Sequence, residues 1–95
     1  MVKHIVFFKF EDNSAEHKQL VHDKIMFLKD KITVLKHLEV GINFSPEERA
    51  FDLALISDFA SKEDLASYAI HPLHVELVTY LKSVNTITKV VDYEY

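Results

Sequence analysis

Hydrophobic and polar positions alternate near the start of the chain with the two-residue spacing of a β-strand. Every second residue of segment 2–10 is apolar or a histidine and falls on one strand face: Val2, His4, Val6, Phe8 and Phe10. The opposite face is also apolar in its middle, at Ile5 and Phe7. Because apolar residues lie on both faces, we expect this strand to be covered from both sides.

The next segment has helical periodicity. Apolar residues recur three or four positions apart, at Val21, Ile25, Leu28 and Ile32. Asn13 precedes Glu16 by three residues, which is the pattern of a capping box at a helix start. The spacing predicts a long first helix over about 14–32.

Two more alternating segments follow the first helix. The first has apolar residues at Leu38, Val40, Ile42 and Phe44, and the second has them at Phe51, Leu53, Leu55 and Phe59. Between them lie Pro46 and the charged turn 47–49. This arrangement predicts two strands joined as an antiparallel hairpin.

A second capping pattern and a proline define the last helical region. Ser61 with Asp64 three residues later starts a short helix that carries Leu65 and Tyr68. Pro72 breaks it, because proline disfavours the helical conformation of the preceding residue while suiting the first turn of a new helix. We expect that new helix to run to about Ser83.

The final segment, Thr86 to Tyr95, reads as a strand, so the elements follow the order β-α-β-β-α-β. This order indicates a single α+β domain, 1–95, with a ferredoxin-like four-stranded antiparallel sheet and its helices on one face. The other face then needs a cover. Since 48% of the residues are hydrophobic in a chain of only 95, we expect a homodimer in which a second sheet supplies that cover.

Composition excludes several classes of function. The single glycine, Gly41, rules out the dinucleotide fingerprint, the P-loop and the nucleophile elbow. Without cysteine there is no thiolate nucleophile, disulfide or cysteine-held metal. The net charge of −4 disfavours a nucleic-acid partner, and no apolar run is long enough to span a membrane. We therefore expect a cytoplasmic protein without a cofactor.

Three segments resemble the stress-responsive dimeric α/β-barrel (Dabb) family. They are the opening Val2–Phe10, the segment from Tyr68 to His74 with its His-Pro-Leu-His sequence, and the closing strand Val90–Tyr95. The resemblance covers nearly the whole chain and implies an eight-stranded barrel formed by two copies. The family includes the plant olivetolic acid cyclase, which implies that the scaffold can carry out cofactor-free chemistry on a carbonyl substrate.

The resemblance also implies roles for three residues. His74 matches a general base, Tyr68 a phenol that orients it or polarises a substrate oxygen, and His4 a group that stabilises an oxyanion. Independently, His74 falls in the first turn of the new helix, where the helix dipole lowers the pKa of an imidazole, whereas a nearby Glu76 would raise it, so the sequence leaves the net direction open. A second pocket tyrosine of the cyclase has no counterpart in segment 24–27, so we expect a more apolar pocket.

The sequence allows three interpretations of these residues. They line a pocket for an uncharged or weakly acidic organic molecule, or they form the active site of a cofactor-free cyclase, lyase or isomerase. Alternatively, they satisfy one another within a dimer that has no ligand. An oxygenase has no specific support. His71 is interpreted as a residue of the helix break.

Metal binding is a further expectation of lower specificity. His71 and His74 lack a third ligand at a typical zinc spacing. The resemblance to plant relatives implies a different cation site, built from the backbone carbonyls of Ile32 and Leu35 with Lys29 at the remaining position. The other histidines are interpreted as surface residues: His17, His22 and His37. The aromatic residues are interpreted mainly as core: Phe7, Phe8, Phe27, Phe44, Phe51 and Phe59.

Overall fold

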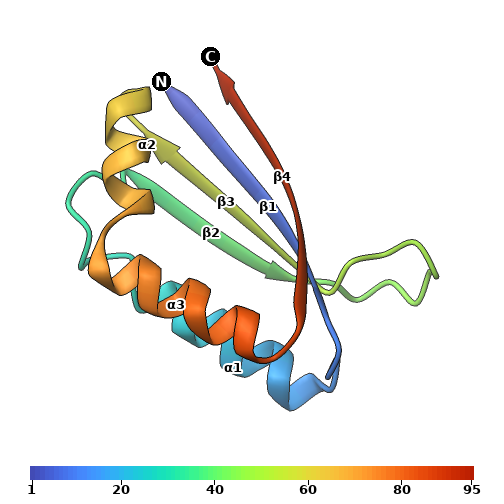
Figure 1. The fold of residues 1–95 in the computed structure, drawn as a ribbon. Coiled ribbons are helices and arrows are strands. Elements are labelled where there is room, and N and C mark those ends of the chain that lie inside the picture. Colours follow the sequence, from blue (N-terminus) through green and yellow to red (C-terminus); the bar gives the residue numbers. More distant parts are fainter.

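The computed structural model describes residues 1–95 and contains four strands and three helices (Figure 1). In chain order these are β1 (Val2–Phe10), α1 (Ala15–Met26), β2 (His37–Ile42), β3 (Leu53–Phe59), α2 (Lys62–Ala69), α3 (Pro72–Ser83) and β4 (Thr86–Glu94). The strands form one antiparallel sheet in the order β2-β3-β1-β4. The predicted ferredoxin-like α+β fold is confirmed, with its second helical region divided into α2 and α3.

The central strand β1 pairs with β3 on one side and with β4 on the other. Val6 lies opposite Leu55 of β3 and opposite Val90 of β4. The predicted faces of β1 are confirmed, since Val6 and Phe8 are buried beneath the helices while Phe7, on the opposite face, is exposed. Figure 1 shows all three helices on one side of the sheet, which leaves the other side bare.

The hydrophobic core lies between the sheet and the helices. It contains residues of β1, α1, the segment after α1, β2, β3, α2 and α3, but none of β4. The inward side of β4 is therefore only partly covered: Val90 is 51% exposed, although its partner on β1, Val6, is buried. The helical layer thus ends above β1 and leaves space beside β4.

The first helix is shorter than the sequence predicts and begins one residue later. Ser14, not Asn13, is the N-cap, and its hydroxyl accepts a hydrogen bond from the His17 amide. The helix ends at Met26 rather than near Ile32. Beyond it the chain makes single turns that bury Leu28, Ile32 and Leu35. The buried residues of these turns are three or four positions apart, as on one face of a helix, which explains why the predicted helix is too long.

The junction of α2 and α3 follows the sequence closely. The Ser61 hydroxyl caps α2 by accepting from the Asp64 amide, and Pro72 is the first residue of α3. His71 is the N-cap of α3, where its Nδ1 accepts a hydrogen bond from the Leu73 amide at 3.1 Å. His71 is thus a residue of the helix break, as predicted.

Several side-chain placements differ from the sequence predictions. Phe44 lies outside β2 in the loop before β3 and is 98% exposed, and Phe7 and Phe27 are also exposed rather than in the core. His17 was expected on the surface but is only 8% exposed, because it packs edge-on against the Phe10 ring at 5.0 Å. Its Nε2 is buried without a hydrogen-bond partner.

None of the helices combines the length and the apolar composition that a membrane crossing requires.

Candidate functional site

His4 reaches the site from β1 and is held by a carboxylate of β4. Its Nδ1 is hydrogen-bonded to a carboxylate oxygen of Asp92, the residue directly opposite His4 in the β1–β4 pairing. A carboxylate oxygen in such a bond accepts, so Nδ1 carries the hydrogen. Nε2 of His4 has no hydrogen bond within the chain and remains available.

His74 is oriented in the same way by a backbone group. It stands in the first turn of α3, and its Nδ1 lies 3.0 Å from the carbonyl oxygen of Ala69 at the end of α2. Since a carbonyl only accepts, Nδ1 donates and Nε2 keeps its lone pair in the neutral imidazole. The break at Pro72 allows this contact, because it turns the start of α3 back towards the last residues of α2.

The pKa of His74 is lowered from its ordinary value of 6.5. Burial is the largest cause, since it disfavours the charged imidazolium, and the nearby imidazoles of His4 and His71 act in the same direction. The hydrogen bond to Ala69 opposes the shift. The sequence left the direction of this shift open between the helix dipole and Glu76, and the structure gives desolvation as the main cause of the lowering. At neutral pH His74 is therefore a base with a free nitrogen.

Tyr68 lies between the two histidines. Its ring centre is 4.4 Å from that of His74 and 6.3 Å from that of His4, and it packs on Phe59 at 5.0 Å. Burial raises the pKa of Tyr68 to about 12, so the phenol stays protonated. The hydroxyl makes no hydrogen bond within the chain, yet it is not among the fully buried unpaired atoms. It thus remains a donor without an acceptor within the chain, although Tyr68 is only 1% exposed.

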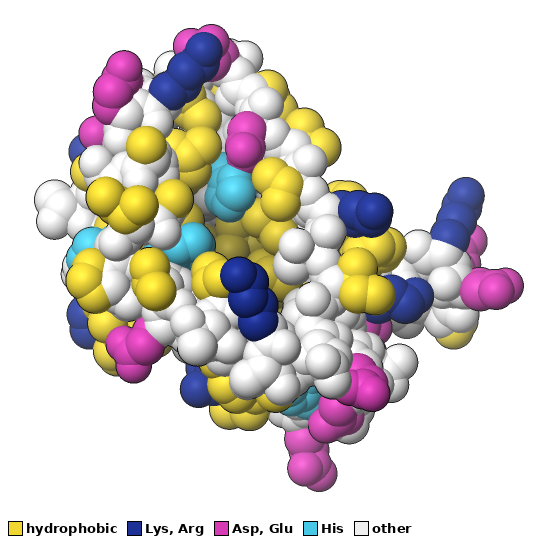
Figure 2. Space-filling model, viewed as in Figure 1, with side chains coloured by type: hydrophobic (Ala, Val, Ile, Leu, Met, Phe, Trp, Pro, Cys, Tyr) yellow, Lys and Arg dark blue, Asp and Glu magenta, His cyan; other side chains and the backbone are white.

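The surface of the molecule has a depression on the face seen in Figure 2. Figure 2 shows the molecule hollowed between the helical layer and the strand at its open edge, with hydrophobic side chains on the floor and histidines on the wall. On the inward side of β4, Thr88 and Val90 are both exposed. The structure brings together His4, Tyr68 and His74, all three residues selected from the sequence.

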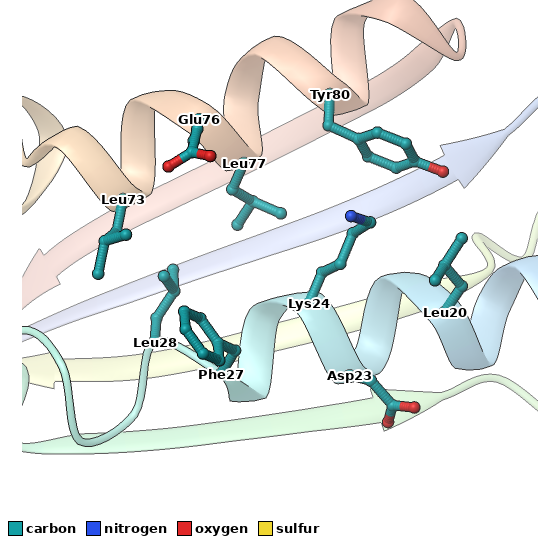
Figure 3. Close-up of a pocket in the computed structure, with 9 residues that line it drawn as sticks. All are labelled: Leu20, Asp23, Lys24, Phe27, Leu28, Leu73, Glu76, Leu77 and Tyr80. Atoms are coloured by element: carbon teal, nitrogen blue, oxygen red, sulfur yellow. The ribbon is translucent and has the colours of Figure 1, made fainter.

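A separate pocket of about 490 Å³ lies on the outer surface between α1 and α3 (Figure 3). Leu73, Leu77 and Tyr80 reach into it from α3, opposite residues of α1 and Phe27, which follows the last residue of α1. It contains no histidine, and the Lys24 ammonium lies within it, 4.5 Å from the centre of the Tyr80 ring. The histidine site and this pocket are thus distinct features.

The structure has no cluster of side chains that could act as metal ligands. No group of three or more histidine, aspartate or glutamate side chains is placed to hold a metal ion. Ile32 and Leu35 lie in the turns after α1, where the Ile32 carbonyl accepts a hydrogen bond from the Leu35 amide. A cation held by these two carbonyls would compete with that turn for the Ile32 oxygen.

Two groups of the site were not selected from the sequence. The Ala69 carbonyl leaves no sequence signal at all. Asp92 does leave one, because a carboxylate interrupts the apolar run of the last strand after Val90 and Val91. Its position opposite His4 depends on the register between the first and last strands, which lie far apart in the sequence.

Comparison with known proteins agrees with this architecture. The sequence profile of the Stress responsive A/B Barrel Domain matches residues 2–95. A stress-response A/B barrel domain-containing protein of Arabidopsis thaliana is 38% identical over 85 residues, which cover 82% of this chain. The matched region makes up 30% of the length of that relative.

Solved structures give the same result. A dimeric protein of unknown function with a ferredoxin-like fold from Bacteroides fragilis is 36% identical, with a TM-score of 0.82 over 99% of this chain and 95% of its own. A hydroxynitrile lyase from Passiflora edulis has a TM-score of 0.81 over 97% of this chain and 90% of its own. At 23% identity the lyase shares the fold alone. The profile match and the Arabidopsis thaliana relative show that the chain belongs to the stress-responsive A/B barrel domain (Dabb) family.

Proposed function

We propose that this protein binds a small organic molecule in the hollow beside His4, Tyr68 and His74. The proposal is supported by the proximity of three polar side chains, since the rings of His4 and His74 lie 6.3 and 4.4 Å from that of Tyr68. Two imidazole nitrogens and one phenol hydroxyl lack partners within the chain, although their other contacts are well defined. Polar groups near a core are normally paired, so their availability together favours a ligand that pairs with them.

The surroundings indicate the chemistry of that ligand. The phenol of Tyr68 donates to an oxygen, and the neutral Nε2 of His74 accepts a hydrogen. Beside them, Val90 presents apolar surface on the inward side of β4. An uncharged or weakly acidic molecule with a carbonyl or hydroxyl group and an apolar body fits this combination.

We further propose that the protein is a homodimer formed through the bare face of the sheet. Large hydrophobic residues are exposed there, among them Phe7, Ile87, Val91 and Tyr93. A monomer seldom leaves so many large apolar side chains together in water. The similar Bacteroides fragilis protein is described as dimeric, which supports the same assembly here.

A second candidate function is cofactor-free catalysis on a carbonyl substrate. It is favoured by the lowered pKa of His74, which keeps its free nitrogen unprotonated at neutral pH and thus able to accept a proton. His74 Nε2 would take a proton from the carbon next to the carbonyl, and the electron pair of that C–H bond would move to form an enolate. The enolate oxygen would accept a hydrogen bond from the Tyr68 hydroxyl.

Native mass spectrometry of protein purified without denaturation tests the binding proposal. The expected result is a species with a discrete additional mass that His74→Ala loses, while the matched control His22→Ala, a histidine of α1 away from the site and from the bare face, retains it. Equal retention by both variants would contradict binding at this site. A clean dimer in every sample would favour the ligand-free structural reading, and a monomer would contradict the proposed assembly.

Catalysis is tested by proton exchange. In D2O, ¹H NMR would follow the loss of the protons next to the carbonyl of 4-phenyl-2-butanone, a neutral ketone with an apolar body. The catalytic hypothesis predicts faster proton–deuterium exchange with wild-type protein than with His74→Ala. Identical rates for wild type, His74→Ala and buffer would leave binding as the function that the site supports.

A further inference from the structure

The loop between β2 and β3 carries an aromatic side chain that the monomer does not use. Phe44 is 98% exposed, the highest value among the exposed large hydrophobic residues. In Figure 1 this loop, residues 43–52, extends away from the end of the sheet beyond the helices. A phenylalanine in this position loses the favourable free energy of burial unless another surface covers it.

The loop is held in shape by its own hydrogen bonds. The Asn43 side chain bonds the backbone of Ser45 in both directions, at 2.7 and 3.1 Å. The Asn43 amide also donates to the carbonyl of Asp52 at 3.0 Å, and the Ala50 amide donates to that of Glu47 at 3.1 Å. Phe44 is therefore presented by a pre-organised loop, which lowers the entropy cost of inserting it into a partner.

An apolar pocket of about 360 Å³ lies at the base of this loop. Phe7, Ile42 and Phe51 line it, and Phe44 itself forms one edge. The paired small residues Gly41 and Ala54 also line it, and a side chain added at Gly41 would meet nothing within 4 Å. Since Phe7 and Ala54 lie opposite each other on the bare side of the sheet, the pocket is continuous with that face.

Charges on the bare face do not oppose a second copy. The strand register places basic and acidic residues among the apolar ones on this side: Lys3, Lys9, Lys89, Glu39 and Asp58. Lys3 and Asp58 already form an ion pair at 3.3 Å. Because both signs occur on the same face, an interface between two copies would not consist of charges of one sign alone.

We propose that Phe44 is a dimer anchor, which inserts from each copy against the bare sheet face of the other. This inference rests on the proposed homodimer and adds the residue that inserts into the partner. In an isologous interface, each Phe44 faces an equivalent apolar surface on the second copy. Buried aromatic anchors dominate the energy of such interfaces, so the loop contributes more than its small size suggests.

Analytical ultracentrifugation of wild type, Phe44→Ala and the control Phe27→Ala tests the anchor. Phe27 is also exposed but lies on the outer helical surface. We expect the dimer dissociation constant of Phe44→Ala to rise by roughly ten-fold or more, with Phe27→Ala unchanged. A dimeric wild type with an equally stable Phe44→Ala dimer would overturn the anchor alone. A monomeric wild type would overturn the homodimer as well.

Cross-linking locates the contact independently of affinity. Since the chain has no cysteine, Phe44→Cys accepts a single benzophenone maleimide. Mixing ¹⁴N and ¹⁵N copies before irradiation distinguishes links between copies from links within one. The anchor predicts links between copies to peptides of the bare face, in particular β1 and β3. Links confined to one copy, or to the outer surfaces of α1 and α3, would overturn it.

Discussion

The phenol ring of Tyr68 lies 4.4 Å, centre to centre, from the imidazole of His74, with an interplanar angle of 47°. The two residues are on different helices, and the break at Pro72 brings them together. Tyr68 is almost completely buried, whereas His74 borders open space. The Tyr68 ring thus packs against the His74 imidazole, while the Tyr68 hydroxyl has no hydrogen-bond partner within the chain.

The ring and the hydroxyl of Tyr68 have separable roles. We expect Tyr68→Ala to lower the free energy of unfolding by about 3–5 kcal/mol, because it removes a buried ring from the core. Tyr68→Phe keeps the ring and removes a hydroxyl that has no partner, so stability should change by less than about 1 kcal/mol while ligand retention falls. Urea unfolding and native mass spectrometry measure the two effects. A large loss of stability in Tyr68→Phe would show that the hydroxyl is structurally paired.

The lowered pKa of His74 predicts a pH dependence of stability. A depressed pKa means that folding disfavours the protonated imidazole, so its contribution is fully present above the unfolded value of about 6.5 and is lost as pH falls through the lower folded value. The free energy of unfolding should therefore decrease below about pH 6.5, and less steeply in His74→Ala. Urea midpoints across this range provide the measurement, with His37→Ala as the control. Equal slopes for wild type and His74→Ala would contradict the assignment.

Asp92 is expected to fix the orientation of His4 rather than to stabilise the fold. The carboxylate is partly exposed, so Asp92→Ala should change the free energy of unfolding by no more than about 1 kcal/mol. Without this acceptor, Nδ1 of His4 loses its preference for carrying the hydrogen. Side-chain ¹⁵N chemical shifts of His4 should then report mixed tautomers. Unchanged shifts in the variant would show that another group orients the ring.

The fold follows from local signals that the tertiary structure reinforces. Alternation in β1, the cap at Ser61 and the break at Pro72 all predicted their elements correctly, because each depends on neighbouring residues. The end of α1 did not, since the turns around Ile32 bury apolar residues with helical spacing. Phe44 extends the alternation of β2, yet no strand pairs with it and the chain turns away.

The site was predictable only where the sequence has a local signal or a family resemblance. His74 and Tyr68 flank a proline and match known positions, but the partners that orient the histidines come from elsewhere. The bond between His4 and Asp92 joins residues 88 positions apart, and that between His74 and Ala69 uses a carbonyl that every residue possesses. Contacts of this kind depend on strand register and helix geometry, which periodicity does not encode.

His17 gives a test of the buried polar groups outside the site. Its Nε2 is buried without a partner beside Phe10, and such an atom carries a desolvation cost. We expect His17→Leu to raise the free energy of unfolding by about 1 kcal/mol, because it keeps the packing and removes that cost. The thermal midpoint of unfolding should rise accordingly. A lower midpoint would indicate that an ordered water already satisfies His17.

We expect a small organic ligand to occupy the hollow beside His4, Tyr68 and His74. ¹H–¹⁵N NMR of the labelled protein, titrated with 4-phenyl-2-butanone, the same neutral ketone with an apolar body, measures this binding. Binding in the hollow predicts saturable shifts concentrated on β1 near His4, on β4 near Val90 and Asp92, and at the start of α3. Shifts confined to the outer pocket between α1 and α3, or no shifts at millimolar concentrations, would contradict it.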